Sequence, residues 1–327
     1  MAVTETWYLD GIYERLLHRK GAGVIRSSHY SGNIHLTKHS NSLLHPWIPQ
    51  VDDNRKKPTN HEIDTYMINR LKRPKEELSY MTFGVNEEHE NLIDENGGII
   101  HLDQSGITAV VYLHSFDDSQ YRFGYDGYDD LLMWTEVTIM QLVKNENVKN
   151  VLVKAHPNVD YKRYPGDHKA YKNLREKFKS KVIWLKSNVS VLSLQNIKNI
   201  VGITHHGSVS EELAFLKIPV IMSSFSRLGN HFRFAHTWTT TNEYEYLLKN
   251  ISVENLKEMV IEYDDLYEYL NLTHMSARNG NIMQSQKTLN DIFSLASKNQ
   301  REQLNSIKIS DERINMYMNS IHKIYSP

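Results

Sequence analysis

The sequence predicts an α/β protein built around a doubly wound parallel sheet. Two observations predict it. From residue 106 onward, short apolar runs alternate with stretches of helical pattern. The runs are also apolar nearly throughout, which is expected of strands that helices cover on both faces. Strands are therefore expected at 107–115, 150–157, 181–186, 199–206 and 218–224.

Three regions of the chain differ in pattern. Residues 1–105 show no clear periodicity and are expected to be irregular, apart from a helix at 60–72. Residues 106–240 hold the predicted sheet, and residues 241–327 are expected to be helical. Between the strands, helices are expected at 129–147, 168–179, 190–198 and 208–217. In the carboxyl-terminal region, helices are expected at 241–249, 253–270, 280–297 and 309–324.

Composition narrows the function classes. A formal net charge of −1 predicts no nucleic-acid partner, because such proteins carry a basic surface. The absence of cysteine excludes disulfides and zinc–thiolate sites and fits a reducing compartment. No window approaches the apolar length of a membrane span, and residues 1–11 do not resemble a signal peptide. The expected protein is therefore cytoplasmic and has no membrane span.

Polar residues gather where the expected strands end. Ligands of open parallel sheets bind beyond this edge, so the residues there are the candidate site. They are, in chain order, His114, Ser115, Asp117, Asp118, Lys154, His156, Asn158, Thr204, His205, His206, Gly207, Ser208, Ser223, Ser224, Ser226, Arg227, His231 and Arg233.

The segment HHGSVSEELAFLKIPVI, residues 205–221, predicts a phosphate site where a strand passes into a helix. Gly207 permits close approach of the backbone, and Ser208 can cap the helix. The backbone N–H groups and the dipole at a helix start favour a phosphate. One turn further on, Glu212 can accept both hydroxyls of a ribose, whereas Glu211 is expected to be solvated. The alternative is an ordinary capped helix of an α/β domain.

A second segment, VKAHPNVDY at 153–161, predicts a cationic contact at a strand end. Pro157 disfavours helical backbone at His156, so the histidine is expected in extended chain. Together with Lys154 it can hold phosphate oxygens by charge-assisted hydrogen bonds. The alternative is a histidine in a simple strand-terminal turn.

A third segment, residues 114–130, predicts a shaped loop over the site. Its Asp126, Asp129 and Asp130 are individually expected to be solvated. The adjacent His205 and His206 are expected to face opposite sides of a strand. No motif with metal-ligand spacing is present despite 17 histidines, so no metal is expected.

Taken together, K-x-H-P at 154–157 and HGSVSEELAFLKIPVI at 206–221 resemble a known family. They are similar to the carboxyl-terminal, nucleotide-binding domain of capsule-polysaccharide GT-B glycosyltransferases, which include bacterial Kdo and sialic acid transferases. The resemblance covers residues 106–240 and implies a Rossmann-like domain, one half of a GT-B enzyme. It implies that His156 and Ser208 bind donor phosphate and that Glu212 binds donor ribose.

The resemblance also implies an activity. A sugar would pass from a nucleotide-sugar donor to a glycan or glycolipid acceptor in surface polysaccharide synthesis, by an inverting reaction without metal or cofactor. The expected donor-binding residues are Lys154, His156, Pro157, His206, Gly207, Ser208, Glu212, Arg227, His231 and Arg233. The expected catalytic residues are His114, Asp117 and Asp118, with Asp118 or Asp117 as the base.

One departure from the family leaves alternatives open. GT-B enzymes have two Rossmann-like domains, and residues 1–105 are short for a complete acceptor domain. The base then comes from the loop after the first strand, or a separate chain supplies the missing domain, or activity is lost. A polyol-phosphate transferase, a nucleotide-sugar epimerase and an inactive nucleotide- or glycan-binding remnant are the alternative functions.

Overall fold

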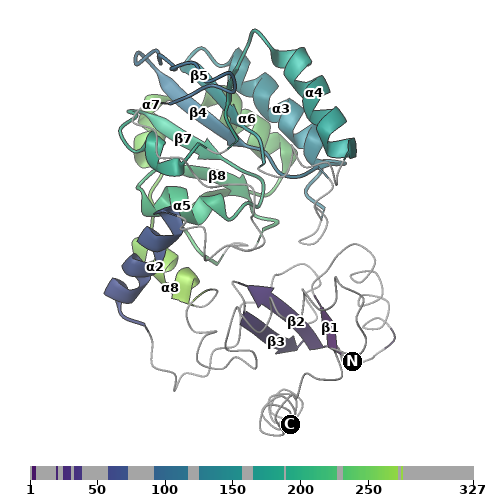
Figure 1. Cartoon of the computed structure of the whole chain (residues 1–327), viewed down its shortest axis with the longest axis vertical. Coiled ribbons are helices and arrows are strands. Elements are labelled where there is room, and N and C mark those ends of the chain that lie inside the picture. The colour runs from purple at the N-terminus through teal and green to yellow at the C-terminus, as the bar shows by residue number, and fades with distance from the viewer. Residues whose placement is uncertain are drawn as a thin grey trace, which may run out of the picture. The chain divides into compact units, whose positions relative to one another are not determined.

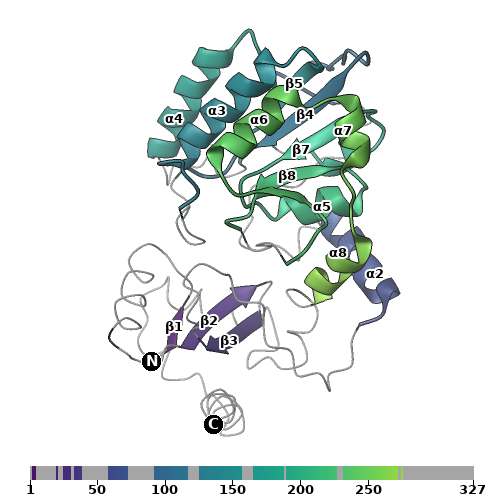
Figure 2. The same cartoon turned by 180° about the vertical axis from the view of Figure 1, so that it is seen from behind.

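The computed structural model describes a large part of the chain. Its described residues are 2–4, 20, 25–30, 33–38, 58–72, 92–116, 125–156, 165–187, 189–226, 231–271 and 274. The chain divides into two compact units, one formed by residues 1–63 with 268–327 and the other by residues 64–267. Figure 1 labels the helices and strands, and Figure 2 shows them from behind.

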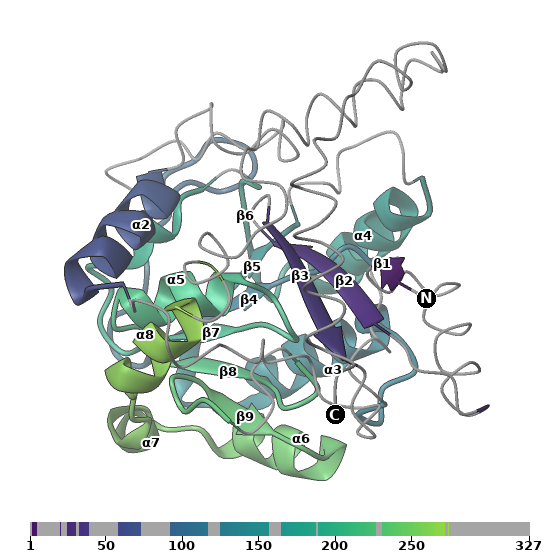
Figure 3. The ribbon, with the colours of Figure 1, turned by 90° about the horizontal axis from the view of Figure 1, so that it is seen from below.

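A six-stranded parallel sheet organises the unit of residues 64–267. Its strands are β4 (Ile107–Tyr112), β5 (Val148–Lys154), β6 (Ile183–Leu185), β7 (Ile200–Ile203), β8 (Val220–Ser223) and β9 (His236–Trp238). Across the sheet they follow the order β6-β5-β4-β7-β8-β9, and every neighbouring pair is parallel (Figure 3). All six strands therefore end at one edge, and the winding reverses between β4 and β7. This is a Rossmann-like, doubly wound sheet.

Successive side chains of the strands alternate between two buried faces. Ala109 and Val111 of β4 join a core with Trp134 and Leu142 of α3 (Leu131–Lys144). Helices α3, α4 (Pro165–Phe178) and α6 (Thr241–Asn250) lie over this face (Figure 2). The intervening Val110 is equally buried and points to the opposite face. Burial on both faces explains why these strands are apolar at nearly every position.

Helix α5 (Val209–Phe215) covers the second face, with Leu213 packed against Gly202 of β7. Gly202, within β7, permits this packing. A Cβ built on Gly202 would lie 2.5 Å from Cδ1 of Leu213, well inside the contact distance of two carbons. Glycine therefore sets the separation between β7 and α5, and with it the place where the loop between them can lie.

Polar caps fix where several helices begin. The carboxylate of Asp130 accepts a hydrogen bond of 2.6 Å from the backbone N–H of Met133 at the start of α3. Thr240 and Glu243 form a reciprocal capping box at α6, and Ser252 begins α7 (Val253–Glu258) in the same way. Asp130, expected to be merely solvated, is thus an exposed helix cap.

The sequence-based fold is confirmed for the sheet, with one added strand, and two of the expected helices differ in the structure. All five expected strands form, and the short β9 is an additional sixth strand. The helix expected at 253–270 is two helices, α7 and α8 (Tyr263–Leu270), and the one expected at 190–198 is a single 3-10 turn, η3 (Val191–Leu194). The helix at 60–72 is α2 (Asn60–Lys72). The helices expected at 280–297 and 309–324 lie outside the described residues.

The other unit contains a small sheet that the sequence analysis did not predict. Strand β1 (Ala2–Thr4) pairs in parallel with β2 (Ile25–Tyr30), and β2 pairs antiparallel with β3 (Asn33–Lys38). Within the hairpin, Tyr30 is opposite Asn33. Strand β2, IRSSHY, has polar residues at four consecutive positions, so it shows neither an apolar run nor an apolar–polar alternation.

The end of α5 generates the first prediction. The backbone N–H groups of Lys217 and Ile218 donate to the carbonyls of Ala214 and Leu213, which is the pattern of a Schellman motif. Lys217 occupies its left-handed position with φ of 64°, where a Cβ is unfavourable. Lys217→Gly should therefore raise the free energy of unfolding by about 0.5–1 kcal/mol, measured in urea. Lys217→Ala retains the Cβ, and an equal gain in that control would contradict the backbone explanation.

Candidate active site at the switch point of the sheet

The candidate site lies beyond the ends of β4 and β7, where the winding of the sheet reverses. In a doubly wound sheet the chains leaving these two strands turn toward opposite faces, which opens a crevice between them. His114 follows β4, and residues 204–208 connect β7 to α5. The topology therefore brings together two polar loops that are 90 residues apart in the chain.

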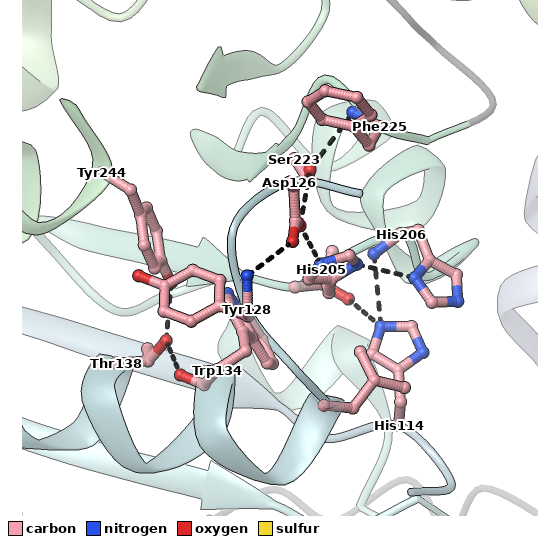
Figure 4. A network of polar contacts seen from close by, with 12 residues as sticks. His114, Asp126, Tyr128, Trp134, Thr138, His205, His206, Ser223, Phe225 and Tyr244 are labelled. Carbon is pink, nitrogen blue, oxygen red and sulfur yellow. Dashed lines mark hydrogen bonds and ion pairs between the residues drawn. The ribbon is translucent and has the colours of Figure 1, made fainter. Parts of the chain in front are cut away.

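His114 is held by the loop that follows β7. Its Nε2 lies 3.2 Å from Oγ1 of Thr204 and accepts a hydrogen bond of 3.3 Å from the backbone N–H of His206 (Figure 4). Because a backbone N–H can only donate, Nε2 of His114 must carry a lone pair. In the neutral ring the hydrogen is then on Nδ1. The contact therefore fixes His114 as a hydrogen-bond donor at Nδ1.

Gly207 is required for this close packing. Its backbone N–H donates to Oγ1 of Thr204 at 3.2 Å. A Cβ at Gly207 would lie 2.6 Å from the same oxygen and 3.4 Å from Cε1 of His114. Any larger residue would push the threonine and the histidine out of place. The glycine predicted to allow close approach to a ligand thus first allows close approach of two site residues.

The two adjacent histidines contact each other, so the expectation that they face opposite sides is wrong. The Nδ1 atoms of His205 and His206 are 2.7 Å apart, and the ring of His206 stacks on His114 at 4.1 Å between centroids. The alternation rule does not apply because β7 ends at Ile203, and residues 204–208 are already a turning loop.

Asp126 is the buried carboxylate of the site, and the expectation that it is solvated is wrong. It is only 5% exposed, and its Oδ2 lies 2.5 Å from Nε2 of His205. The carboxylate also accepts hydrogen bonds from the backbone N–H of Tyr128 and the hydroxyl of Ser223 (Figure 4). Burial opposes its charge, but these donors, His205 foremost, lower the pKa of Asp126 below its ordinary value.

Burial lowers the pKa of a histidine, whereas it raises that of a carboxylate. The ring of His205 is fully buried, and the rings of Trp134 and Trp238 are T-shaped to it, at 5.4 and 5.9 Å between centroids. Desolvation lowers the pKa of His205, and the hydrogen bond that its ring donates to Asp126 offsets only part of this. At neutral pH the pair is therefore a carboxylate beside a neutral imidazole.

A second buried cluster lies at the first turn of α5. Arg70 of α2 pairs with Glu211 through Nη1 and with Oε1 of Glu212 through Nε at 3.2 Å. Its Nη2 also donates to the carbonyl of Ser208 at 3.0 Å. Burial works against the charge, but Glu211 above all raises the pKa of Arg70 above its ordinary value. One guanidinium thus ties α2 to the loop and to the start of α5.

Three predicted features lie in or beside this cluster. Glu211, expected to be solvated, is 1% exposed and paired, so that expectation is wrong. Ser208 occupies the N-cap position, but its side chain makes no capping hydrogen bond. Glu212 lies one turn beyond Ser208 as predicted, and its role toward a ribose stays a prediction.

The other predicted residues lie at the same edge of the sheet or outside the described residues. Lys154 ends β5, with its Nζ 5.9 Å from the ring centre of Tyr112, and His156 follows it. Arg233 is exposed and pairs with Asp265 of α8. His231 is also exposed. The residues outside the described part are Asp117, Asp118, Pro157, Asn158 and Arg227.

One further polar pair adjoins the site. The hydroxyl of Ser115, next to His114, donates to the buried carboxylate of Asp167 in α4. This contact ties the loop after β4 to α4. Within the described residues, no group of three or more histidine, aspartate or glutamate side chains has an arrangement that could hold a metal ion.

No described helix is both long and apolar enough to cross a membrane.

Comparison with known proteins gives matches among solved structures alone. No family model matches the chain, and no curated protein matches it. KpsC of Thermosulfurimonas dismutans, described as a beta Kdo 2,4 transferase, is 11% identical, with 82% of this chain and 77% of that chain covered and a TM-score of 0.44. An alpha,alpha-trehalose 6-phosphate synthase of Burkholderia multivorans is 10% identical, with coverage of 91% and 60% and a TM-score of 0.40. A UDP-forming alpha,alpha-trehalose-phosphate synthase of Burkholderia vietnamiensis is 9% identical, with 90% and 62% covered and a TM-score of 0.40. This chain spans less than two thirds of either synthase.

The neutral, buried His205 predicts a pH dependence of stability. Its folded pKa is lower than the value of about 6.5 in an unfolded chain, so the unfolded state binds the proton more readily. The stabilisation is complete above that value and is lost as the pH falls below it. His205→Gln should remove up to about 1.4 kcal/mol per pH unit from the slope of unfolding free energy against pH in this window. Urea unfolding from pH 7.5 to 5 measures the slope. The exposed His236, changed in the same way, should leave it unchanged, and equal slopes in all three proteins would refute the prediction.

The buried arginine predicts a large loss of stability. Arg70→Met leaves two carboxylates buried without their cation and should cost about 3–5 kcal/mol of unfolding free energy. The loss of unfolding free energy in Arg70→Lys should lie between zero and the loss in Arg70→Met, because a lysine keeps the charge but cannot form the fork of hydrogen bonds. Lys72→Met, an exposed position on the same helix, is the matched control for denaturant unfolding. A loss below 1 kcal/mol in Arg70→Met would show that water replaces the guanidinium there.

Proposed function

We propose that the chain is a glycosyltransferase that uses a nucleotide-sugar donor bound at the switch point between β4 and β7. The observation that carries the proposal is the packing of His114 on His206 across this point, beside Gly207. Two imidazoles at the end of a doubly wound sheet supply hydrogen-bond donors where ligands of such sheets bind. The strand-end K-x-H-P and HGSVSEELAFLKIPVI motifs support the same family.

In this proposal the imidazoles hold the donor phosphates. The backbone N–H groups of His206 and Gly207 donate within the loop, to His114 and to Thr204. The ring N–H of His114 is therefore the better candidate to meet a phosphate oxygen, together with the ring of His206 beside it and with Lys154 and His156 from the end of β5. Fixed donors of this kind stabilise the negative charge that develops on the departing nucleotide.

The remaining parts of the proposal concern the base, the acceptor and the ribose. Asp117 or Asp118, which follow His114 in the sequence, is proposed to accept the proton of the acceptor hydroxyl in an inverting reaction. The acceptor is proposed to be a glycan or glycolipid of a surface polysaccharide. Glu212 is proposed to receive the ribose hydroxyls beside Arg70. Binding is proposed to need no metal, so a chelator should leave it unchanged.

A ligand panel tests the proposal. CMP, CDP, UDP, GDP and their sugars are screened by thermal unfolding, since a ligand of the folded state raises the melting temperature. For the best ligand, His114→Ala and His206→Ala should each weaken affinity by about 1.5–3 kcal/mol, the scale of a charged hydrogen bond. Calorimetry measures the loss, and the exposed His236→Ala is the control. Release of nucleotide in the presence of glycan acceptors tests transfer. A panel without any stabilising nucleotide or nucleotide sugar would refute the proposal.

A further inference from the structure

A chain of three side chains runs from a buried carboxylate toward the proposed ligand site. Asp126 contacts Nε2 of His205, and Nδ1 of His205 contacts Nδ1 of His206 at 2.7 Å (Figure 4). A carboxylate only accepts, so Nε2 of His205 carries a hydrogen and, in the neutral ring, its Nδ1 carries the lone pair. His206 must then donate from Nδ1. The carboxylate thereby fixes the hydrogen positions of two rings in succession.

Among the three residues of this chain, a further proton can be taken up at Nε2 of His206. In the neutral ring this nitrogen carries the lone pair, since Nδ1 is the donor. A proton there makes His206 an imidazolium that donates from Nδ1 to His205, with the carboxylate of Asp126 beyond. The positive charge gains a negative partner through the intervening ring, as in other carboxylate–imidazole pairs.

The stacked His114 is a poor competitor for this proton. Its Nε2 already accepts the backbone N–H of His206, and a hydrogen on Nε2 would oppose that donor. Two imidazolium rings stacked at 4.1 Å would also repel each other. The pair therefore holds one positive charge at most, and Asp126 directs it to His206.

We propose that Asp126, His205 and His206 form a proton relay that makes anion binding at the switch point proton-coupled. His206 takes up a proton at Nε2 from solvent when a phosphate arrives, and the new N–H donates to a phosphate oxygen. His206 returns the proton when the anion leaves. Asp126 and His205 are positioning residues that act through His206. As a phosphate-binding device for the donor, this rests on the proposed function, but the relay itself is defined by the protein alone.

Within the described residues, the groups that face the rings of His205 and His206 come from several parts of the unit. His114 follows β4, Asp126 precedes α3, and Ser223 ends β8, while Tyr128 and Tyr244 lie beyond the tryptophans. Of these, Asp126 supplies the negative charge. Burial raises the pKa of Tyr244, so this phenol stays neutral. The relay therefore predicts tighter anion binding as the pH falls toward 6.

Histidine-labelled protein followed by ¹⁵N NMR tests the relay without any nucleotide. Sulfate is the probe, because it keeps its charge between pH 6 and 8, and sodium chloride at equal ionic strength is the reference. In the wild-type chain at pH 7.5, saturating sulfate should bring about one proton onto His206, assigned by its loss in His206→Gln. Asp126→Asn, which keeps the shape and removes the charge, should reduce this uptake at least fivefold. Asp129→Asn, exposed in the same loop, should not change it.

The outcomes separate the relay from the proposed function. Sulfate-driven protonation of His206 that Asp126→Asn preserves would overturn the relay, and so would no protonation in the wild type. If Asp126→Asn fails to unfold cooperatively, His205→Phe takes its place, since it keeps a ring of similar size but can neither donate to Asp126 nor accept from His206. Asp126-dependent protonation without any nucleotide binding would retain the relay as an anion site and refute the glycosyltransferase. Nucleotide-sugar binding with His206 still neutral would overturn the relay and leave the glycosyltransferase proposal standing.

Discussion

A buried carboxylate has to be surrounded by hydrogen-bond donors, and at Asp126 this requirement organises the end of the sheet. The donors come from a loop, from the segment after β7 and from the end of β8, so one charge holds three pieces of chain together. His205 fills the space between this carboxylate and the rest of the site, and the tryptophans around it exclude water. The pair is costly to bury, and its cost is offset only while every donor is in place. A site built on such a pair is rigid for the same reason.

The sheet topology determines which loops can meet there. Reversal of the winding between β4 and β7 separates the segments that leave these strands, and His114 and His206 close the gap by stacking. The loop of residues 204–208 is then held at both ends. Thr204 contacts His114, and the carbonyl of Ser208 accepts from Arg70. Gly202 and Gly207 make the arrangement possible by letting α5 approach β7 and the histidine approach the loop. Preorganised donors of this kind lose little entropy when a ligand arrives.

Much of this fold could be predicted from the sequence because burial on both faces leaves a strong signal. Apolar runs such as that of β4 admit few other interpretations, and the parallel topology places their polar ends at one edge. The pairing of residues within the site could not be predicted in this way. Asp126 stands among other aspartates in a polar segment, and its burial depends on His205, 79 positions away. Arg70 is 141 residues from Glu211. Long-range charge pairs leave no periodic trace, so a local interpretation assigns each partner to solvent.

The Arg70 cluster also affects how the proposed ribose contact of Glu212 can be tested. Glu211 and Glu212 share one guanidinium, and an arginine in a protein does not give up its proton. Removing either carboxylate therefore leaves Arg70 with part of its charge uncompensated, whether or not a ribose is bound. A loss of affinity in Glu212→Gln combines this disturbance with any lost ribose contact. The two contributions separate only when the ligand is changed as well, because a 2′,3′-dideoxy nucleotide removes the ribose contact and leaves the arginine undisturbed. Coupling between the two changes, rather than the loss in either one, is the quantity that reports a ribose on Glu212.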